Sequence, residues 1–280
     1  WDLLTDQTTG KKIPLALDPF YFLRVAETIV ETEGSLPEVD NMRSPSQNMP
    51  WHPEIMPFVI VYMYKISNLF GEYSLREVDI FSPVAFYFIG MVLFFFLIYI
   101  LTKSKGAALL GSAFLAFSPA YLYRTMAGFS DHEAIGMVAI FSFFLIYALA
   151  LKNFEKNWKN VIFYSILSGF MIVFVLATWG GAITLVLTTM PFAFFMYWFF
   201  AKKDDFKAIS FYVLLFLSTI LFPVIFGYPW TDMLNRFSGS YGLFVPFMLI
   251  FVLIDFGLSK IDDKFKNIKF EKYKIFYSLG

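Results

Sequence analysis

The stretch PVAFYFIGMVLFFFLIYIL, residues 83–101, contains no charged side chain. A helix needs about 20 such residues to cross roughly 30 Å of hydrocarbon. Six further apolar runs follow, and only Asp255 places a formal charge inside one: Ala107 to Tyr123, Ala134 to Leu151, Val161 to Ala177, Gly181 to Phe200, Ala208 to Phe226 and Tyr241 to Leu258. Repeated runs of this length are not a signal peptide. The sequence therefore predicts an all-α, polytopic transmembrane helical bundle in a lipid bilayer.

Composition supports a membrane protein and excludes several other classes. Hydrophobic residues make up 58% of the chain, aromatics 21% and charged residues 16%, so a soluble domain would expose a large apolar area. The formal net charge of zero gives no nucleic-acid-binding signature. The absence of cysteine excludes disulfides and thiolate metal sites.

The basic residues between the apolar runs predict the orientation of the chain. One set of connections is rich in lysine: Lys103 and Lys105, then Lys152, Lys156 and Lys159, then Lys202, Lys203 and Lys207, then six lysines from Lys260 to Lys274. The opposite set holds only Arg124 and Arg236. Because cytoplasmic loops retain positive charge, the lysine-rich set is predicted to be cytoplasmic. The amino-terminal segment and the loops at 124–133, 178–180 and 227–240 then lie on the external face of a cell membrane.

These assignments divide the chain into three parts. Residues 1–82 are predicted to form a first external loop, with amphipathic helices near Asp18 to Glu31 and Glu54 to Leu69. Residues 83–258 form the seven-helix region, and residues 259–280 a lysine-rich cytoplasmic connection to a further span. Because the chain begins at Trp1 and ends within a new apolar run, we expect truncation at both ends.

The first candidate site residue is Asp18, in the stretch LDPFYFLR at residues 17–24. Asp followed by Pro is typical of a helix start, where the carboxylate caps free N–H groups. The alternative is a catalytic carboxylate on the external side, and one side chain can serve both roles.

The second candidate is RTMAGFSDHE, residues 124–133, which places Asp131 and Glu133 at the external mouth of a span. Two carboxylates beside hydrocarbon repel one another and lose hydration, and a cation keeps both ionised. Oxygen ligands without cysteine favour Mg²⁺ or Mn²⁺. The alternative is structural, because Ser130 and Glu133 have the spacing of a capping box.

Both histidines of the chain and one tryptophan fall in the predicted external segments. His52 lies in MPWHP, residues 49–53, and His132 lies between the two acids. Either imidazole could donate a hydrogen bond to phosphate oxygens, or be satisfied structurally by the backbone. Trp179, in the external turn TWGG at residues 178–181, is either part of such a site or an interface anchor.

The order of these motifs resembles the AglB branch of the oligosaccharyltransferase catalytic subunits, glycosyltransferases of the GT-C class. The shared elements are Asp-Pro-aromatic-aromatic, Trp-His-Pro, Arg-Thr-x-x-Gly-Phe-x-Asp-x-Glu and Trp-Gly-Gly. The resemblance covers nearly the whole chain and corresponds to the front part of the family's membrane domain.

The resemblance implies transfer of an oligosaccharide from a polyprenyl or dolichyl (pyro)phosphate carrier to asparagine in an Asn-x-Ser/Thr acceptor polypeptide. It implies that Asp18 is catalytic and binds the metal, Mn²⁺ or Mg²⁺, together with Asp131 and Glu133. It places His52, His132 and Trp179 near the phosphate of the lipid donor.

Two departures from the family pattern limit this prediction. Ala16 stands where the family often has an acidic residue, and the family's later Glu-bearing loop and Trp-Trp-Asp domain are not in this sequence. We therefore expect the chain by itself to be inactive or nearly so. The alternatives are another GT-C enzyme, such as a protein O-mannosyltransferase, and a polytopic transporter. The acid pair argues against the first, and the uncharged spans argue against the second.

Overall fold

The computed structural model describes residues 2–40, 42, 47–48, 55–200 and 205–264, and the fold is almost entirely helical. The bundle consists of α3 (Leu75–Thr102), α4 (Lys105–Ala116), α5 (Pro119–Thr125), α6 (His132–Asn153), α7 (Trp158–Thr178), α8 (Ile183–Phe200), α9 (Asp205–Leu221), α10 (Thr231–Ser238) and α11 (Phe244–Lys264). Short 3₁₀ helices lie at η1 (Asp2–Leu4), η2 (Phe154–Lys156) and η3 (Phe222–Phe226). The all-α bundle predicted from the sequence is confirmed.

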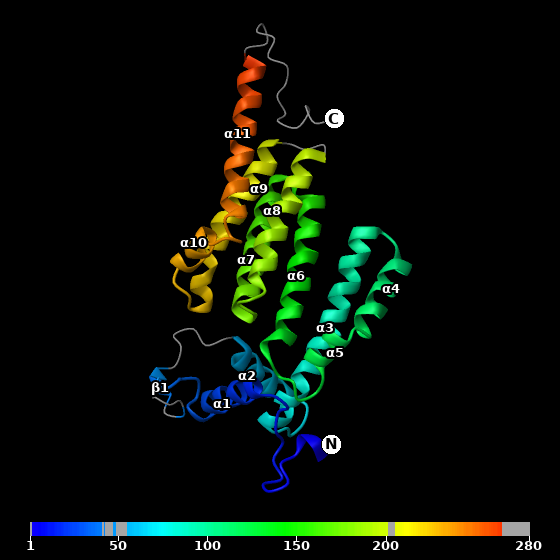
Figure 1. Cartoon of the computed structure of the whole chain (residues 1–280), viewed down its shortest axis with the longest axis vertical. Helices are drawn as coiled ribbons and strands as arrows, with labels where there is room; N and C mark the ends of the chain where they lie inside the picture. Colours follow the sequence, from blue (N-terminus) through cyan, green and yellow to red (C-terminus); the bar gives the residue numbers. More distant parts are fainter. Residues whose placement is uncertain (1, 41, 43–46, 49–54, 201–204, 265–280) are drawn as a thin grey trace.

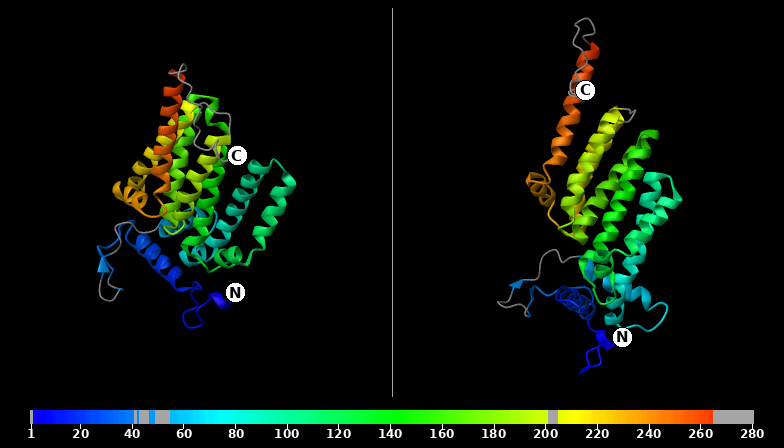
Figure 2. Two further views of the ribbon diagram at one scale, coloured as in Figure 1. Left: turned by 45° about the horizontal axis from the view of Figure 1, so that its top comes forward. Right: turned by 45° about the vertical axis from the view of Figure 1, so that its right-hand side comes forward.

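The amino-terminal part of the chain packs across one end of this bundle (Figures 1 and 2). It contains α1 (Leu17–Glu31), α2 (Ile55–Ser67) and a two-stranded antiparallel pair, β1 (Val39–Asp40) with β2 (Gln47–Asn48). Phe22 of α1 and Met56 of α2 are buried in one cluster with Ala134 and Ile135 of α6. The first turn of α6 therefore packs directly against the amino-terminal helices.

Helix α3 begins eight residues before the predicted span. Ser74 and Glu77 form a capping box, in which the Glu77 amide donates to Ser74 Oγ at 3.2 Å and the Ser74 amide donates to Glu77 Oε2 at 2.8 Å. The helix ends where Lys103 adopts a left-handed conformation, with φ of 59°. Residues 75–82 thus belong to the bundle and not to the preceding loop.

Five helical segments in the described part of the chain are long and apolar enough to cross a bilayer: Leu75–Thr102, His132–Lys156, Trp158–Thr178, Ile183–Phe200 and Phe206–Phe226. The span predicted at Ala107 to Tyr123 is broken instead into α4 and α5, bent by 65°, because Pro119 begins a new helix and has no N–H to continue the old one. The last predicted span corresponds to α11, whose apolar part, Phe244–Leu258, is shorter than a full crossing.

Aromatic packing forms the main core between α6, α7, α8, α9 and α11. The buried rings of Phe154 and Phe211 stack with centroids 4.6 Å apart, and the Tyr212 hydroxyl donates to the carbonyl of Val245 at 3.2 Å. Polar groups must find partners inside a bilayer, since lipid offers none. Asp255, the acid within the last predicted span, accepts a hydrogen bond from Trp198 Nε1 at 2.8 Å.

Within the described residues, lysine contacts bring three of the lysine-bearing connections together at one end of the bundle. Lys152 Nζ donates to the carbonyl of Ile100, at the end of α3, and Lys207 Nζ donates to the carbonyl of Glu155 at 3.0 Å. Helix α6 begins at His132 at the opposite end of the bundle and reaches this end at Lys152, in its last turn. The lysines and the predicted acidic site therefore lie at opposite ends of the bundle.

Candidate metal and phosphate site

The loop between α5 and α6 carries the candidate site and is held from two sides. Gly128 has φ of 89°, and its amide donates to the carbonyl of Ile80 in α3 at 2.9 Å. Its own carbonyl accepts from the amide of Leu15, just before α1, at 2.9 Å. The positive φ favours glycine here, and a Cβ would also lie 2.6 Å from Leu4 Cδ2 and 2.9 Å from Leu15 Cγ. The amino-terminal segment is thereby fastened to the loop.

Asp131 caps α6 and begins the acidic cluster. Its Oδ1 accepts from the His132 amide at 2.7 Å and lies 2.9 Å from His132 Nδ1. Glu133 follows in the first helical turn, where a negative charge is favoured by the helix dipole. The capping box expected from Ser130 and Glu133 is not formed, because the cap is Asp131 itself.

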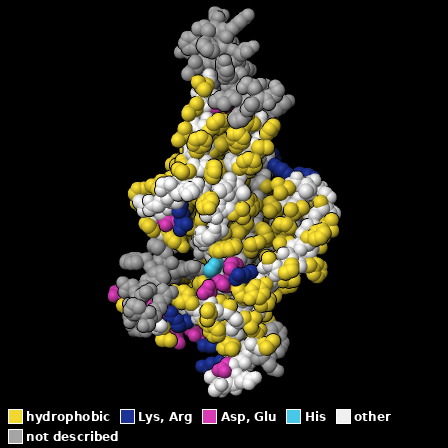
Figure 3. Space-filling view, in the orientation of Figure 1, with side chains coloured by type: hydrophobic (Ala, Val, Ile, Leu, Met, Phe, Trp, Pro, Cys, Tyr) yellow, Lys and Arg dark blue, Asp and Glu magenta, His cyan; other side chains and the backbone are white. Residues whose placement is uncertain are grey.

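These three side chains are close enough to share one ion. One ligand atom from each of Asp131, His132 and Glu133 lies within 4.8 Å of the other two. Figure 3 shows acidic side chains gathered around the histidine at the border of the apolar bundle. The three residues are consecutive in the chain, and the start of α6 brings their ligand atoms together.

A positive charge and hydrogen-bond donors near the cluster partly offset the negative charge of its carboxylates. Arg124 Nη1 lies 2.9 Å from Glu133 Oε1, and the guanidinium stands 5.0 Å above the ring of Phe129. Burial by itself raises the pKa of Asp131, but the imidazole and the backbone N–H of His132 outweigh it and hold that pKa below its usual value. Asp131 is therefore an ionised carboxylate that is only 4% exposed.

The donor set fits a divalent cation. Carboxylates are ligands of Mn²⁺, Mg²⁺ and Zn²⁺, and the imidazole would add a nitrogen ligand for Zn²⁺. Glu133 Oε2 is buried and has no hydrogen-bond partner in the described residues. Buried polar atoms normally have a partner, and a bound cation would supply one here. A hard ion needs further ligands, which water or substrate phosphate can supply.

Asp18 lies on the neighbouring helix but is not one of these three clustered residues. Helix α1 begins at Leu17 with Ala16 as its cap, so Asp18 sits in the first turn and makes no capping hydrogen bond. The capping alternative is therefore wrong. Asp18 is exposed, and Phe22, one turn further on the same face, contacts His132 edge to face at 5.9 Å. The face of α1 that carries Asp18 thus turns toward the cluster.

Trp179 is brought to the cluster by the packing of α7 on α6. Its ring lies 6.2 Å from that of His132, measured between centroids. Gly136 makes this possible, since a Cβ there would lie 2.7 Å from Trp179 Cβ. His52 lies outside the described residues.

Sequence reasoning missed two contacts of the site. It assigned no role to Arg124, the first residue of the motif at 124–133, whose guanidinium pairs with Glu133 in the structure. It also overlooked Asp79, a buried acid of α3 that accepts a hydrogen bond from Ser130 at 2.9 Å. The capping box at Ser74 and Glu77 was readable and would have placed Asp79 inside the helix.

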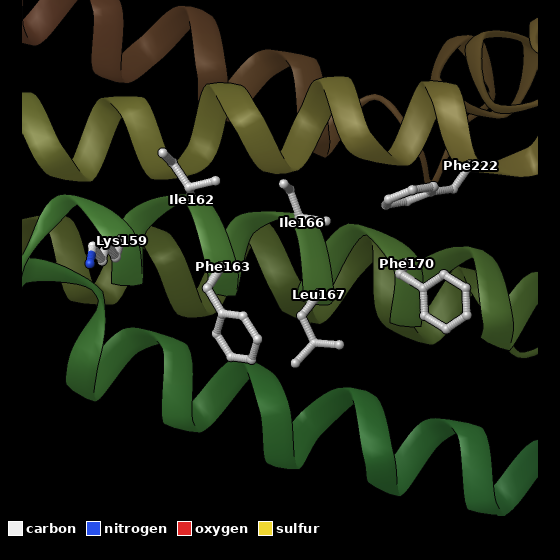
Figure 4. A pocket seen from close by; sticks show the side chains of 7 residues that line it. All are labelled: Lys159, Ile162, Phe163, Ile166, Leu167, Phe170 and Phe222. Carbon is white, nitrogen blue, oxygen red and sulfur yellow. The ribbon is translucent and has the colours of Figure 1, made fainter.

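An apolar hollow lies along α7 and has no residue in common with the acidic cluster. Figure 4 shows apolar side chains of α7 and the ring of Phe222 from η3 around it, with the side chain of Lys159 at one end. Its lining residues are Lys159, Ile162, Phe163, Ile166, Leu167, Phe170 and Phe222. With no acidic residue in its lining, it is separate from the candidate metal site.

Comparison with known proteins identifies relatives in the family that the motifs resemble. The dolichyl-phosphooligosaccharide-protein glycotransferase of Methanococcus voltae is 23% identical over 211 residues, which cover 71% of this chain and 21% of that relative. The crystal structure of the Archaeoglobus fulgidus oligosaccharyltransferase with Zn and sulfate superposes with a TM-score of 0.70 at 18% identity, covering 94% of this chain and 34% of the other.

The archaeal oligosaccharyltransferase AglB from Archaeoglobus fulgidus, in complex with an inhibitory peptide and a dolichol-phosphate, superposes with a TM-score of 0.60 at 17% identity. That match covers 90% of this chain and 34% of the other. This chain thus spans about a fifth of the length of the curated relative and a third of the solved chains. Residues 3–279 match the family described as "Oligosaccharyl transferase STT3, N-terminal". The chain belongs to this oligosaccharyltransferase family.

Proposed function

We propose that this chain forms the membrane-embedded front part of an enzyme that transfers an oligosaccharide from a dolichyl or polyprenyl (pyro)phosphate carrier to asparagine in Asn-x-Ser/Thr sequons. The observation that carries the proposal is the convergence of Asp131, His132 and Glu133 at one end of an apolar bundle. The family match removes the support for a transporter.

The lysine distribution supports an external site. The turns that carry Lys103, Lys152 and Lys207 lie at the end of the bundle opposite to Asp131. Since lysine-rich loops remain in the cytoplasm, the acidic cluster faces the outside of the cell membrane.

The reaction breaks the bond between the anomeric carbon and the phosphate oxygen and forms a bond from that carbon to the amide nitrogen, with inversion. The phosphate leaves with the bonding electron pair, and the nitrogen loses a proton. A divalent ion, Mn²⁺ or Mg²⁺, supplies charge stabilisation to the departing phosphate when bound. Asp131 and Glu133 would hold that ion, and a solved relative in complex with Zn and sulfate supports metal binding in the family.

The remaining residues act on the two substrates. The amide nitrogen is a poor nucleophile because its lone pair is delocalised. The exposed carboxylate of Asp18 would engage its N–H groups and, as the family motif implies, would be a further ligand of the metal. His132 and Trp179, whose rings lie 6.2 Å apart, would contact the donor phosphate, and the Trp-His-Pro motif is the reason to propose the same role for His52. A relative solved with an inhibitory peptide and dolichol-phosphate supports both substrate classes.

The test is Asp131→Ala in the intact protein, assayed with a lipid-linked oligosaccharide and an Asn-x-Thr peptide. We expect loss of Mn²⁺-dependent transfer and of Mn²⁺ binding, measured by electron paramagnetic resonance. Asp232→Ala is the matched control, because this acid of α10 pairs with Arg236, 2.8 Å away and one turn on, and does not belong to the acidic cluster. Unchanged transfer in Asp131→Ala would remove the metal site from the proposal.

A further inference from the structure

Asp79 is a carboxylate buried where an apolar residue would be expected. It lies five residues inside α3 and is 0% exposed. Its Oδ1 has no hydrogen-bond partner among the described residues. Burial of a carboxylate with an unsatisfied oxygen costs free energy, and a well-packed apolar side chain of similar volume is often more stable. Fold stability therefore does not account for an acid at this position.

The only side chain hydrogen-bonded to this carboxylate, in the described part of the chain, belongs to the loop of the metal site. Ser130 Oγ donates to Asp79 Oδ2 at 2.9 Å, and both residues are fully buried. The neighbouring charges, Arg76 and Glu27, pair with each other at 2.7 Å. The carboxylate is thus directed at the loop.

Two consecutive residues of α3 hold this loop. Asp79 binds Ser130 through its side chain, and Ile80 accepts from the amide of Gly128 through its carbonyl. Ser130 is bonded covalently to Asp131, the cap of α6 and the first member of the acidic cluster. A rotation of the Ser130 backbone would therefore move the Asp131 carboxylate directly.

We propose that Asp79 is a positioning residue, which holds Ser130 so that Asp131 and Glu133 meet a divalent cation in one geometry. It touches neither the ion nor a substrate. Side chains that hydrogen-bond to metal ligands change metal affinity by about 10- to 100-fold when they are removed, and Asp79 acts one residue away, which favours the lower end of that range. This inference rests on the proposed function, since it assumes that the acidic cluster binds a cation.

The experiment measures Mn²⁺ alone, by the resonance of the free ion, with purified intact protein in detergent. In Asp79→Leu the acceptor for Ser130 is lost, and we expect the dissociation constant for Mn²⁺ to rise about 10-fold. Asp79→Asn restores it toward the wild-type value, because the amide oxygen can still accept from Ser130. The KM for the acceptor peptide at saturating Mn²⁺ stays unchanged in both variants.

Ser130→Ala removes the same hydrogen bond from the side of the loop and leaves Asp79 in place. It should raise the Mn²⁺ dissociation constant as much as Asp79→Leu, and the double variant should show no additional loss, because the two residues act through one hydrogen bond. Ser82→Ala is the matched control, since its hydroxyl donates to the Asp79 main-chain carbonyl at 2.9 Å and does not reach the loop.

The outcomes separate the two proposals. If Ser130→Ala and Asp79→Leu lower the thermal midpoint but leave Mn²⁺ affinity unchanged, Asp79 is structural and the inference is overturned. If Asp131→Ala itself binds Mn²⁺ as tightly as wild type, the metal site of the proposed function fails instead.

Discussion

Replacing Gly136 by alanine tests whether close packing of α6 on α7 sets the position of Trp179. The new Cβ would lie 2.7 Å from Trp179 Cβ and 3.0 Å from Trp179 Cε3, whereas carbon atoms prefer about 3.5–4.0 Å. Trp179 Cβ is attached to the backbone at the end of α7, so rotation of the side chain about χ1 cannot relieve the contact. The two helices must separate by about 1 Å, judged from that preferred spacing.

The magnitude follows from two opposing effects. Overpacking of this kind costs about 1–3 kcal/mol, while alanine in place of glycine within a helix favours folding by about 1 kcal/mol. We expect a net destabilisation of about 0–2 kcal/mol. The larger effect is local, because displacement of Trp179 from His132, now 6.2 Å away, disturbs the proposed phosphate position. Misplacement by 1 Å can reduce a rate by about 100-fold.

The assay is peptide glycosylation by the intact protein, with the thermal midpoint measured in parallel. Gly257→Ala in α11 is the matched control, since a Cβ there meets nothing within 4 Å, and we expect its activity to stay unchanged and its midpoint to stay equal or rise. Wild-type activity in Gly136→Ala, or an equal loss in the control, would refute the packing argument.

Phe154→Ala should lower the thermal midpoint by the equivalent of about 3–5 kcal/mol, because it removes a fully buried ring stacked on Phe211, and it should leave Mn²⁺ affinity unchanged. The lowered pKa of Asp131 makes the stability of the fold depend on pH. The ionised Asp131 carboxylate contributes its full stabilisation above the ordinary pKa of 3.8, and this contribution is lost as the pH falls through the lower pKa of the folded state. Below about pH 4, the thermal midpoint of wild type should therefore approach that of Asp131→Asn, and a difference that is constant with pH would contradict the assigned charge.

Several features of the fold followed from short stretches of sequence. The apolar runs predicted helices of crossing length because partition into lipid depends on local composition and length. Asp131, His132 and Glu133 are adjacent in the chain, so a helix start suffices to bring their ligand atoms together. Even here the local signal was ambiguous, since Ser130 was a plausible cap and the structure uses Asp131.

The sequence by itself determined the helical membrane character of this protein, the alternation of lysine-rich and lysine-poor connections between its apolar runs, and the presence of a paired-carboxylate motif. Only the tertiary structure decided the partners of that motif. Asp79 lies 51 residues from Ser130, and Trp179 reaches His132 from the end of another helix. No local pattern encodes such contacts, because they depend on how α3, α6 and α7 pack together. Side-chain volume and small residues such as Gly136 govern that packing.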